Sequence, residues 1–114
     1  MGKPVFIAVY SDGSVNSDPT NRIWTGDSGS RSLAFMVLYR PSGVIENRKP
    51  QIGNYTAGQT VSLTPFFANN PKFSSYVILA NYLSVCGKLG SFAGLAPSGF
   101  NTSTAAIDSI IGFG

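Results

Sequence analysis

The chain has 114 residues, a formal net charge of +3 and an isoelectric point near 9.2. Apolar residues make up 43%, as in ordinary globular proteins, but charged residues make up only 11%, less than half of their usual share. There is no histidine, and Cys86 is the single cysteine, so the sequence lacks the commonest general base and cannot form an internal disulfide. With five carboxylates in all, we expect no enzyme, no metal site, no cofactor and no small-molecule substrate.

The length fits one domain, spanning residues 1–114. A soluble monomer usually needs a charged surface to stay dispersed, so a chain this poor in charge is expected to cover much of its surface with copies of itself. We see no apolar run long enough to cross a bilayer and no signal peptide, and we expect no membrane partner.

The first two-thirds of the chain are rich in strand signals. Residues 5–10 are apolar, with β-branched and aromatic side chains, and the turn-forming residues 11–14 follow them, which predicts a hairpin. A short strand is expected at 22–25. Residues 33–39 form the most apolar run, ended by a turn at 41–43, and we interpret them as a strand buried on both faces.

Two more strands are expected before the sequence pattern changes. Residues 44–55 contain Pro50, which favours an edge strand or a bulge. Residues 56–58 predict a tight turn. Residues 59–67 alternate between polar and apolar side chains, which is typical of a strand with one face in water.

The remaining residues favour helices. Asn70 is expected to cap a helix that begins at Pro71 and ends near Gly87 or Gly90. Residues 90–101 are small and glycine-rich and are expected to form a loop. A last helix should begin at Thr102 or Ser103 and run through residue 111.

The chain is therefore predicted to be α+β, with a hairpin and antiparallel sheet over 1–69 and two helices over 70–114. The first helix is apolar over more than half of its circumference, more than one small sheet can cover. A partner chain could cover the rest. The residues expected at that dimer interface recur at helical spacing: Phe73, Val77, Ala80 and Leu83. Cys86, also on this helix, is expected to be a buried thiol.

Four short segments resemble, in order, the coat proteins of single-stranded RNA bacteriophages of the levivirus type. Residues 64–70 (TPFFANN) are similar to the junction between the last strand and the first helix, and residues 47–49 (NRK) to the start of an RNA-facing strand. Residues 18–21 (DPTN) are similar to the loop after the N-terminal hairpin, and residues 105–110 to the short last helix. The chain departs from the family in its shortened loop at 56–58.

The resemblance implies an interlocked homodimer in which the helices of each subunit cover the sheet of the other. Such dimers assemble in the bacterial cytoplasm into an icosahedral virion shell around the RNA genome. In many members the sheet also binds an RNA hairpin and represses translation. The resemblance therefore implies two partners, a second copy of the chain and single-stranded viral RNA.

Several polar residues are candidates for contact with that RNA. Asn47, Lys49 and Gln51 share one parity of their predicted strand and match family positions that face RNA, although a solvated strand face would look the same. The remaining candidates are the flanking Tyr39 and Arg40, and Gln59 and Thr60 on the last strand, whose register is ambiguous.

Two further functions remain open at this point. A β-rich subunit of a filament or appendage, without nucleic acid, also fits the low charge. A sugar-binding module could use Trp24 and the tyrosines as platforms. The NRK segment and the trailing helices favour the coat protein.

Overall fold

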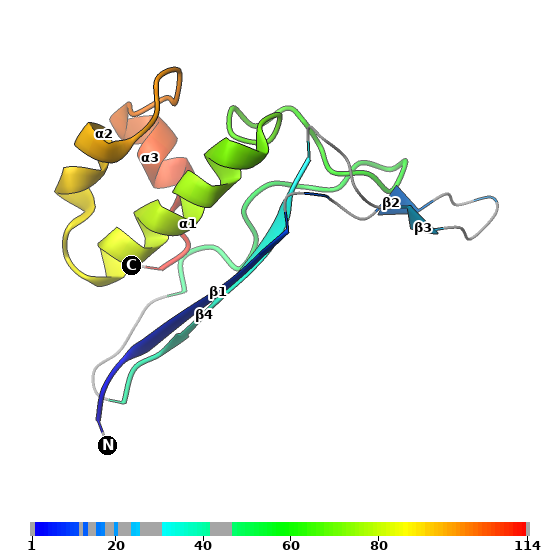
Figure 1. Ribbon diagram of the computed structural model, residues 1–114. Helices are drawn as coiled ribbons and strands as arrows, with labels where there is room; N and C mark the ends of the chain where they lie inside the picture. Colours follow the sequence, from blue (N-terminus) through cyan, green and yellow to red (C-terminus); the bar gives the residue numbers. More distant parts are fainter. Residues whose placement is uncertain are drawn as a thin grey trace.

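The computed structural model describes residues 2–11, 13, 16–17, 20, 24–25, 31–41 and 47–113. A long two-stranded β-ribbon forms one side of the molecule, and helices packed on one face of that ribbon form the other (Figure 1). This arrangement confirms the α+β class.

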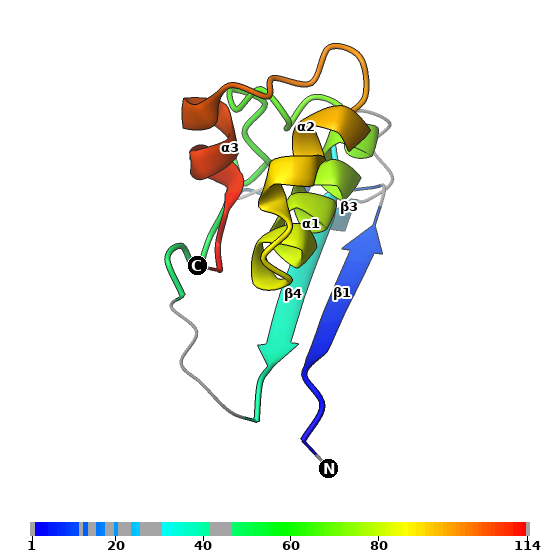
Figure 2. The same cartoon turned by 90° about the vertical axis from the view of Figure 1, so that its left-hand side faces the viewer.

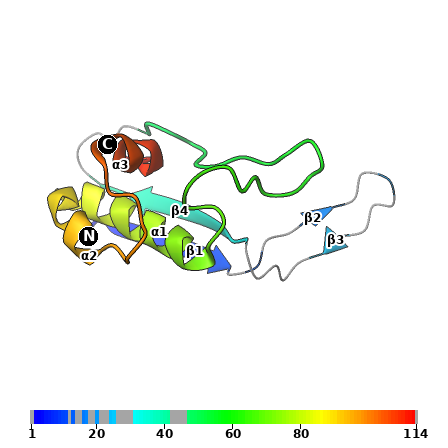
Figure 3. The same cartoon turned by 90° about the horizontal axis from the view of Figure 1, so that it is seen from above.

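The described strands form two antiparallel pairs, and one pair is nested inside the other along the chain. β1 (Val5–Ser11) is antiparallel to β4 (Leu33–Tyr39), with Val5 opposite Tyr39 and Ser11 opposite Leu33. Between them, β2 (Asn16–Ser17) pairs with β3 (Trp24–Thr25). Figures 1 and 3 show β2 and β3 extending away from the helices.

This pairing corrects the predicted hairpin. The turn signal at 11–14 was expected to fold the next residues back onto β1, but the partner of β1 is β4. Every position of β4 is apolar or aromatic, and β4 offers β1 seven paired positions, whereas β2 and β3 are two residues each. The predicted strand at 22–25 is present at Trp24–Thr25, and its first two residues lie outside the described part of the chain.

Residues 47–70, between the ribbon and the first helix, do not form a sheet. The strands predicted at 44–55 and 59–67 are absent from these described residues, where the backbone forms two isolated bridges, Asn47 with Phe113 and Tyr55 with Val61. The predicted turn at 56–58 is confirmed by the Gln59 N–H, which donates to the Thr56 carbonyl at 3.0 Å. The alternation of polar and apolar residues over 59–67 did not predict the structure correctly, because the apolar residues of this segment do not pack on one face of a sheet.

The first helix, α1 (Pro71–Val85), begins as the sequence predicts. Asn70 is its N-cap, with a side chain that accepts a hydrogen bond from the Lys72 N–H at 3.0 Å, and proline occupies the first helical turn. The helix ends at Cys86, and Gly87 follows with a φ of 67°. The Lys88 N–H donates to Leu83 O at 2.7 Å and the Gly87 N–H to Ser84 O at 3.0 Å, which is a Schellman motif.

The predicted loop at 90–101 proves to be partly helical. It contains a 3-10 turn η1 (Leu89–Ser91) and a short helix α2 (Phe92–Leu95), so the described chain has three α-helices where two were expected. The last helix, α3 (Thr104–Ile110), is capped by Ser103, as predicted. Phe92 and Phe100 bury their rings beside α1, and that burial orders a segment whose glycines alone favour a loop.

The hydrophobic core lies among the helices. Its buried members are Val77, Ala80, Phe92, Phe100, Ile110 and Ile111. Phe100 is at the centre, with its ring 5.1 Å from that of Phe66, 5.2 Å from Phe73 and 5.4 Å from Phe92. No described residue of β1 or β4 belongs to this core.

Candidate functional site

The β1–β4 sheet has one face covered by α1 (Figure 2). The Phe6 ring on this face lies 5.6 Å from the ring of Tyr82 in α1, and 6.2 Å from that of Phe113. The Tyr10 hydroxyl donates to the Pro71 carbonyl at the start of α1. Because side chains alternate along a strand, even-numbered residues of both strands lie on this face.

The opposite face of the sheet is apolar and exposed. Its odd-numbered side chains lie in opposite pairs across the two strands, and none carries a charge. Phe35 is 59% exposed, Tyr39 57% and Ile7 50%. We call this surface the bare face; its members are Val5, Ile7, Val9, Ser11, Leu33, Phe35, Val37 and Tyr39.

The bare face corrects the expectation that 33–39 is buried on both sides. The run is a strand, as predicted, but in the single chain its odd-numbered residues are open to solvent. An unbroken apolar run indicates two faces that avoid water, and the helices of this chain are enough to cover one of them.

One end of the same sheet is cationic. Because Val5 pairs with Tyr39, the residues just before β1 and just after β4 lie at the same end of the sheet. Lys3 and Arg40 are both exposed there, beside the exposed ring of Tyr39. We call Lys3, Tyr39 and Arg40 the basic end. The sequence pointed to Tyr39 and Arg40, whereas Lys3 joins them through a strand pairing that its sequence neighbours do not reveal.

The other RNA candidates are elsewhere. Asn47, Lys49 and Gln51 line a cavity of about 370 Å³ between the outer edge of β4, the segment 47–62 and α1. Asn47 and Gln51 are exposed, and the Gln51 amide donates to the Gly53 carbonyl at 2.9 Å. The three residues are therefore brought together, but along a cavity wall and not on a strand face.

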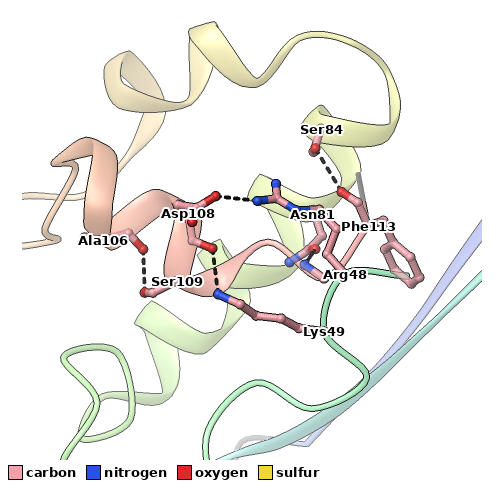
Figure 4. A network of polar contacts seen from close by, with 9 residues as sticks. Arg48, Lys49, Asn81, Ser84, Ala106, Asp108, Ser109 and Phe113 are labelled. Carbon is pink, nitrogen blue, oxygen red and sulfur yellow. Dashed lines mark hydrogen bonds and ion pairs between the residues drawn. The ribbon is translucent and has the colours of Figure 1, made fainter. Parts of the chain in front are cut away.

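Two cations of the NRK segment are held by the last helix (Figure 4). Arg48 Nη2 lies 2.6 Å from Asp108 Oδ1 and forms an ion pair with it. The Lys49 ammonium donates to the Asp108 carbonyl at 2.9 Å, near the end of α3 where the helix dipole favours a cation. The sequence did not single out Asp108 as the partner of this pair.

Gln59 and Thr60 lie in the turn after Tyr55. Gln59 is exposed and has a φ of 60°, and the Thr60 hydroxyl lies 3.2 Å from that of Thr56. The turn is close to the first half of β4, since Tyr55 and Val61 share the cavity with Leu33. Tyr39 and Arg40 stand at the other end of that strand, so the seven RNA candidates form no single surface.

The four residues expected at the dimer interface contribute to the packing of their own chain. Val77 is 6% exposed and Ala80 is fully buried in the core, and Phe73 and Leu83 pack against that core. The helix is covered by α2, α3 and their connections on one side and by the sheet on the other. In the single chain, most of the large exposed apolar side chains therefore lie on the bare face and not on α1.

A buried asparagine ties the C-terminal residues to α1, and the sequence analysis did not single it out. The fully buried Asn81 amide donates to Val77 O and to Ile110 O, both at 2.9 Å. Its oxygen accepts from the Gly112 N–H at 2.7 Å. An asparagine within an apolar helix is the available signal, because a buried amide needs such partners.

Cys86 is exposed, which corrects the expectation of a buried thiol. It hydrogen-bonds the Tyr82 side chain, and this contact raises the pKa of Tyr82 above its usual value of 10.0.

Within the described residues, no three histidine, cysteine or carboxylate side chains gather where they could hold a metal ion. None of the helices in that part of the chain is long and apolar enough to cross a membrane.

Comparison with known proteins leaves the family open. No family model, no curated protein and no solved structure matches this chain.

Proposed function

We propose that the chain is a coat subunit of a single-stranded RNA bacteriophage, which assembles with copies of itself in the bacterial cytoplasm into a virion shell around RNA. One observation carries the proposal: a single sheet presents both an uncharged apolar face and a basic end. A self-assembling RNA-packaging subunit needs one surface for other subunits and another for phosphate.

The basic end suits single-stranded RNA. Lys3 and Arg40 supply positive charge for phosphates, and both lie just beyond the ends of β1 and β4, outside the bare face. The described residues carry seven of the eight cations of the chain, Lys3, Arg31, Arg40, Arg48, Lys49, Lys72 and Lys88, against one carboxylate, Asp108. We assign the first contact with RNA to the basic end because Arg48 and Lys49 are already bonded to Asp108.

A filament subunit is the second candidate. β1 and β4 each have one neighbour in their sheet, so each presents an outer edge of backbone groups that another strand could extend. This candidate needs no basic end and predicts fibres without nucleic acid.

The test is expression of the full chain in bacteria, followed by size exclusion with absorbance at 260 and 280 nm and electron microscopy of the largest species. The proposal predicts closed particles of uniform size that hold nuclease-protected RNA. Fibres without RNA would replace the proposal with the filament subunit. A chain that forms neither, even when mixed with RNA, would contradict both.

RNA contact at the basic end has its own test. Arg40→Ala and Lys3→Ala should each weaken RNA binding at low salt and each reduce the salt slope of log K by about 1. Lys88→Ala is the matched control, because Lys88 is exposed at the end of α1, among the helices. Equal losses in all three variants would show binding by net charge alone.

A further inference from the structure

We infer that the cavity between β4, residues 47–62 and α1 is a binding site for a small, neutral aromatic molecule. We call this space the side cavity. The inference goes beyond the proposed function and does not depend on it, since binding in the side cavity requires neither RNA nor a second chain.

The side cavity reaches from the surface to the core, and its volume is about 370 Å³. Asn47 and Gln51 line it and are exposed, which leaves a path for entry from solvent. Ala68 and Val77 line it too, but each is only 6% exposed, and Val77 belongs to the core. A molecule that enters is therefore largely surrounded by protein, as in most small-molecule sites.

The walls of the side cavity favour an apolar molecule. Large apolar side chains line it from β4, from residues 47–62 and from α1. An apolar cavity of roughly 150 Å³ holds benzene, so a space of about 370 Å³ has room for roughly two rings. The apolar side chains that line it include Met36, Ile52, Val61, Phe67, Val77 and Ile78.

Charge selects a neutral ligand. Of the described residues that line the side cavity, Lys49 alone carries a charge. Its ammonium donates to the carbonyl of Asp108, which is on α3 and does not line the cavity (Figure 4). A charged group placed in the cavity would lose water without gaining a free counter-ion, so an uncharged molecule is favoured.

The outer edge of β4 can accept one uncharged polar group of the ligand. β4 has a single neighbour in its sheet, β1, so its other edge presents backbone donors and acceptors toward the side cavity. The backbone hydrogen bonds of the described residues 47–62 stay within that segment or go to the C-terminal residues, and none reaches β4. A hydroxyl or N–H on the aromatic molecule can therefore bond to this edge.

Titration of the full chain with 2-naphthol tests the site, because this probe has two rings, one hydroxyl and no charge. Calorimetry should show saturable binding, and saturation should raise the midpoint of thermal unfolding. The control ligand is 2-naphthoate, which keeps the rings and carries a carboxylate. It should bind about tenfold more weakly or worse, because the cavity offers its charge no free partner.

A cavity-filling variant tests where the probe binds. Ala34 lines the side cavity, so Ala34→Phe should place a ring in the space and abolish binding of 2-naphthol. Ala8→Phe is the matched control. Ala8 is an even-numbered residue of β1, on the same face of the sheet as Ala34, and it does not line the cavity. Ala8→Phe should bind 2-naphthol as the natural chain does.

The methyl group of Met36 provides a second measurement, which needs no cavity-filling variant. Met36 is half-buried and lines the side cavity. In the natural chain with ¹³C-labelled methionine methyl groups, 2-naphthol should shift the Met36 signal, because an aromatic ring placed beside a methyl group changes its magnetic environment. Met36→Leu identifies the signal.

Three outcomes would overturn the inference. The first is no saturable binding to the natural chain up to the solubility limit of 2-naphthol. The second is equal binding of 2-naphthol and 2-naphthoate, which would exclude selection of a neutral ligand. The third is binding that leaves the Met36 signal unmoved, and this signal also decides the location if Ala34→Phe does not fold.

Discussion

The helical part of the molecule and the β-ribbon differ in how each covers its apolar side chains. In the helical part, α1 lies between the sheet and the later helices, and the core around Phe100 is closed. The ribbon is covered on one face and leaves seven large apolar side chains exposed on the other. We therefore expect the stability of the single chain to come mainly from the helical part, and association with other chains to come from the ribbon.

Truncating one aromatic ring in each region should give the largest contrast. Phe100→Ala removes a ring that is 7% exposed and contacts three other phenylalanines, so it should lower the free energy of unfolding by about 4 kcal/mol. Phe35→Ala, at 59% exposure, should cost less than about 1 kcal/mol in the dilute chain. Urea unfolding at low concentration measures both. Equal losses would mean that the ribbon belongs to the same closed core.

Removing the buried amide should be the next largest change. Asn81→Ala leaves the Gly112 N–H and the Ile110 carbonyl without this partner inside the protein, and should cost about 3 kcal/mol. The exposed Asn69→Ala provides the control and should change the free energy of unfolding by less than about 0.5 kcal/mol. A small loss at Asn81 would mean that the C-terminal residues are not fixed to α1.

A smaller effect is expected where the last residues pass between α1 and residues 47–49. A Cβ on Gly112 would lie 3.0 Å from the Lys49 carbonyl, so Gly112→Ala should cost about 1–2 kcal/mol. Gly94→Ala is the matched control: a Cβ there meets no atom within 4 Å, and the better helix propensity of alanine should stabilise α2 by about 0.5 kcal/mol. Thermal unfolding of both variants checks the sign of each change.

The smallest effect concerns the ion pair on the surface. Arg48 and Asp108 are 41% and 59% exposed, so Arg48→Ala should lower the free energy of unfolding by less than about 1 kcal/mol, and this loss should shrink at high salt.

If this pair does keep Arg48 from RNA, Asp108→Asn should strengthen RNA binding at low salt. A loss of RNA binding in Asp108→Asn would contradict that assignment.

The sequence predicted the helical elements better than the sheet, for a physical reason. Caps are local, so Asn70, Pro71 and Ser103 marked the helix starts correctly. Strand pairing and burial depend on distant residues, which is why the partner of β1 and the exposure of β4 were predicted wrongly. Phe92 and Phe100 turned an expected loop into part of the core because side-chain burial outweighed the glycine-rich backbone signal.

The candidate site was predictable only in its residue types. Tyr39 and Arg40 were singled out by their place at the end of an apolar strand. Lys3 could be recognised as their neighbour only from the pairing of Val5 with Tyr39. Lys49 was singled out for charge, but its hydrogen bond to the Asp108 carbonyl depends on how α3 packs. A single sequence shows which charged and aromatic side chains are present, but it does not show which of them lie in contact in the folded chain.

Our central claim is that the helical core is fully packed in the single chain, whereas the bare face of the ribbon is covered only when chains associate. Hydrogen exchange at several protein concentrations tests this claim most directly. In dilute solution, amides of α1 around Val77 and Asn81 should exchange slowly, and those of β1 and β4 much faster. Raising the concentration should slow exchange in β1 and β4 while leaving α1 unchanged. Exchange in β1 and β4 that is as slow as in α1 at every dilution would contradict the account.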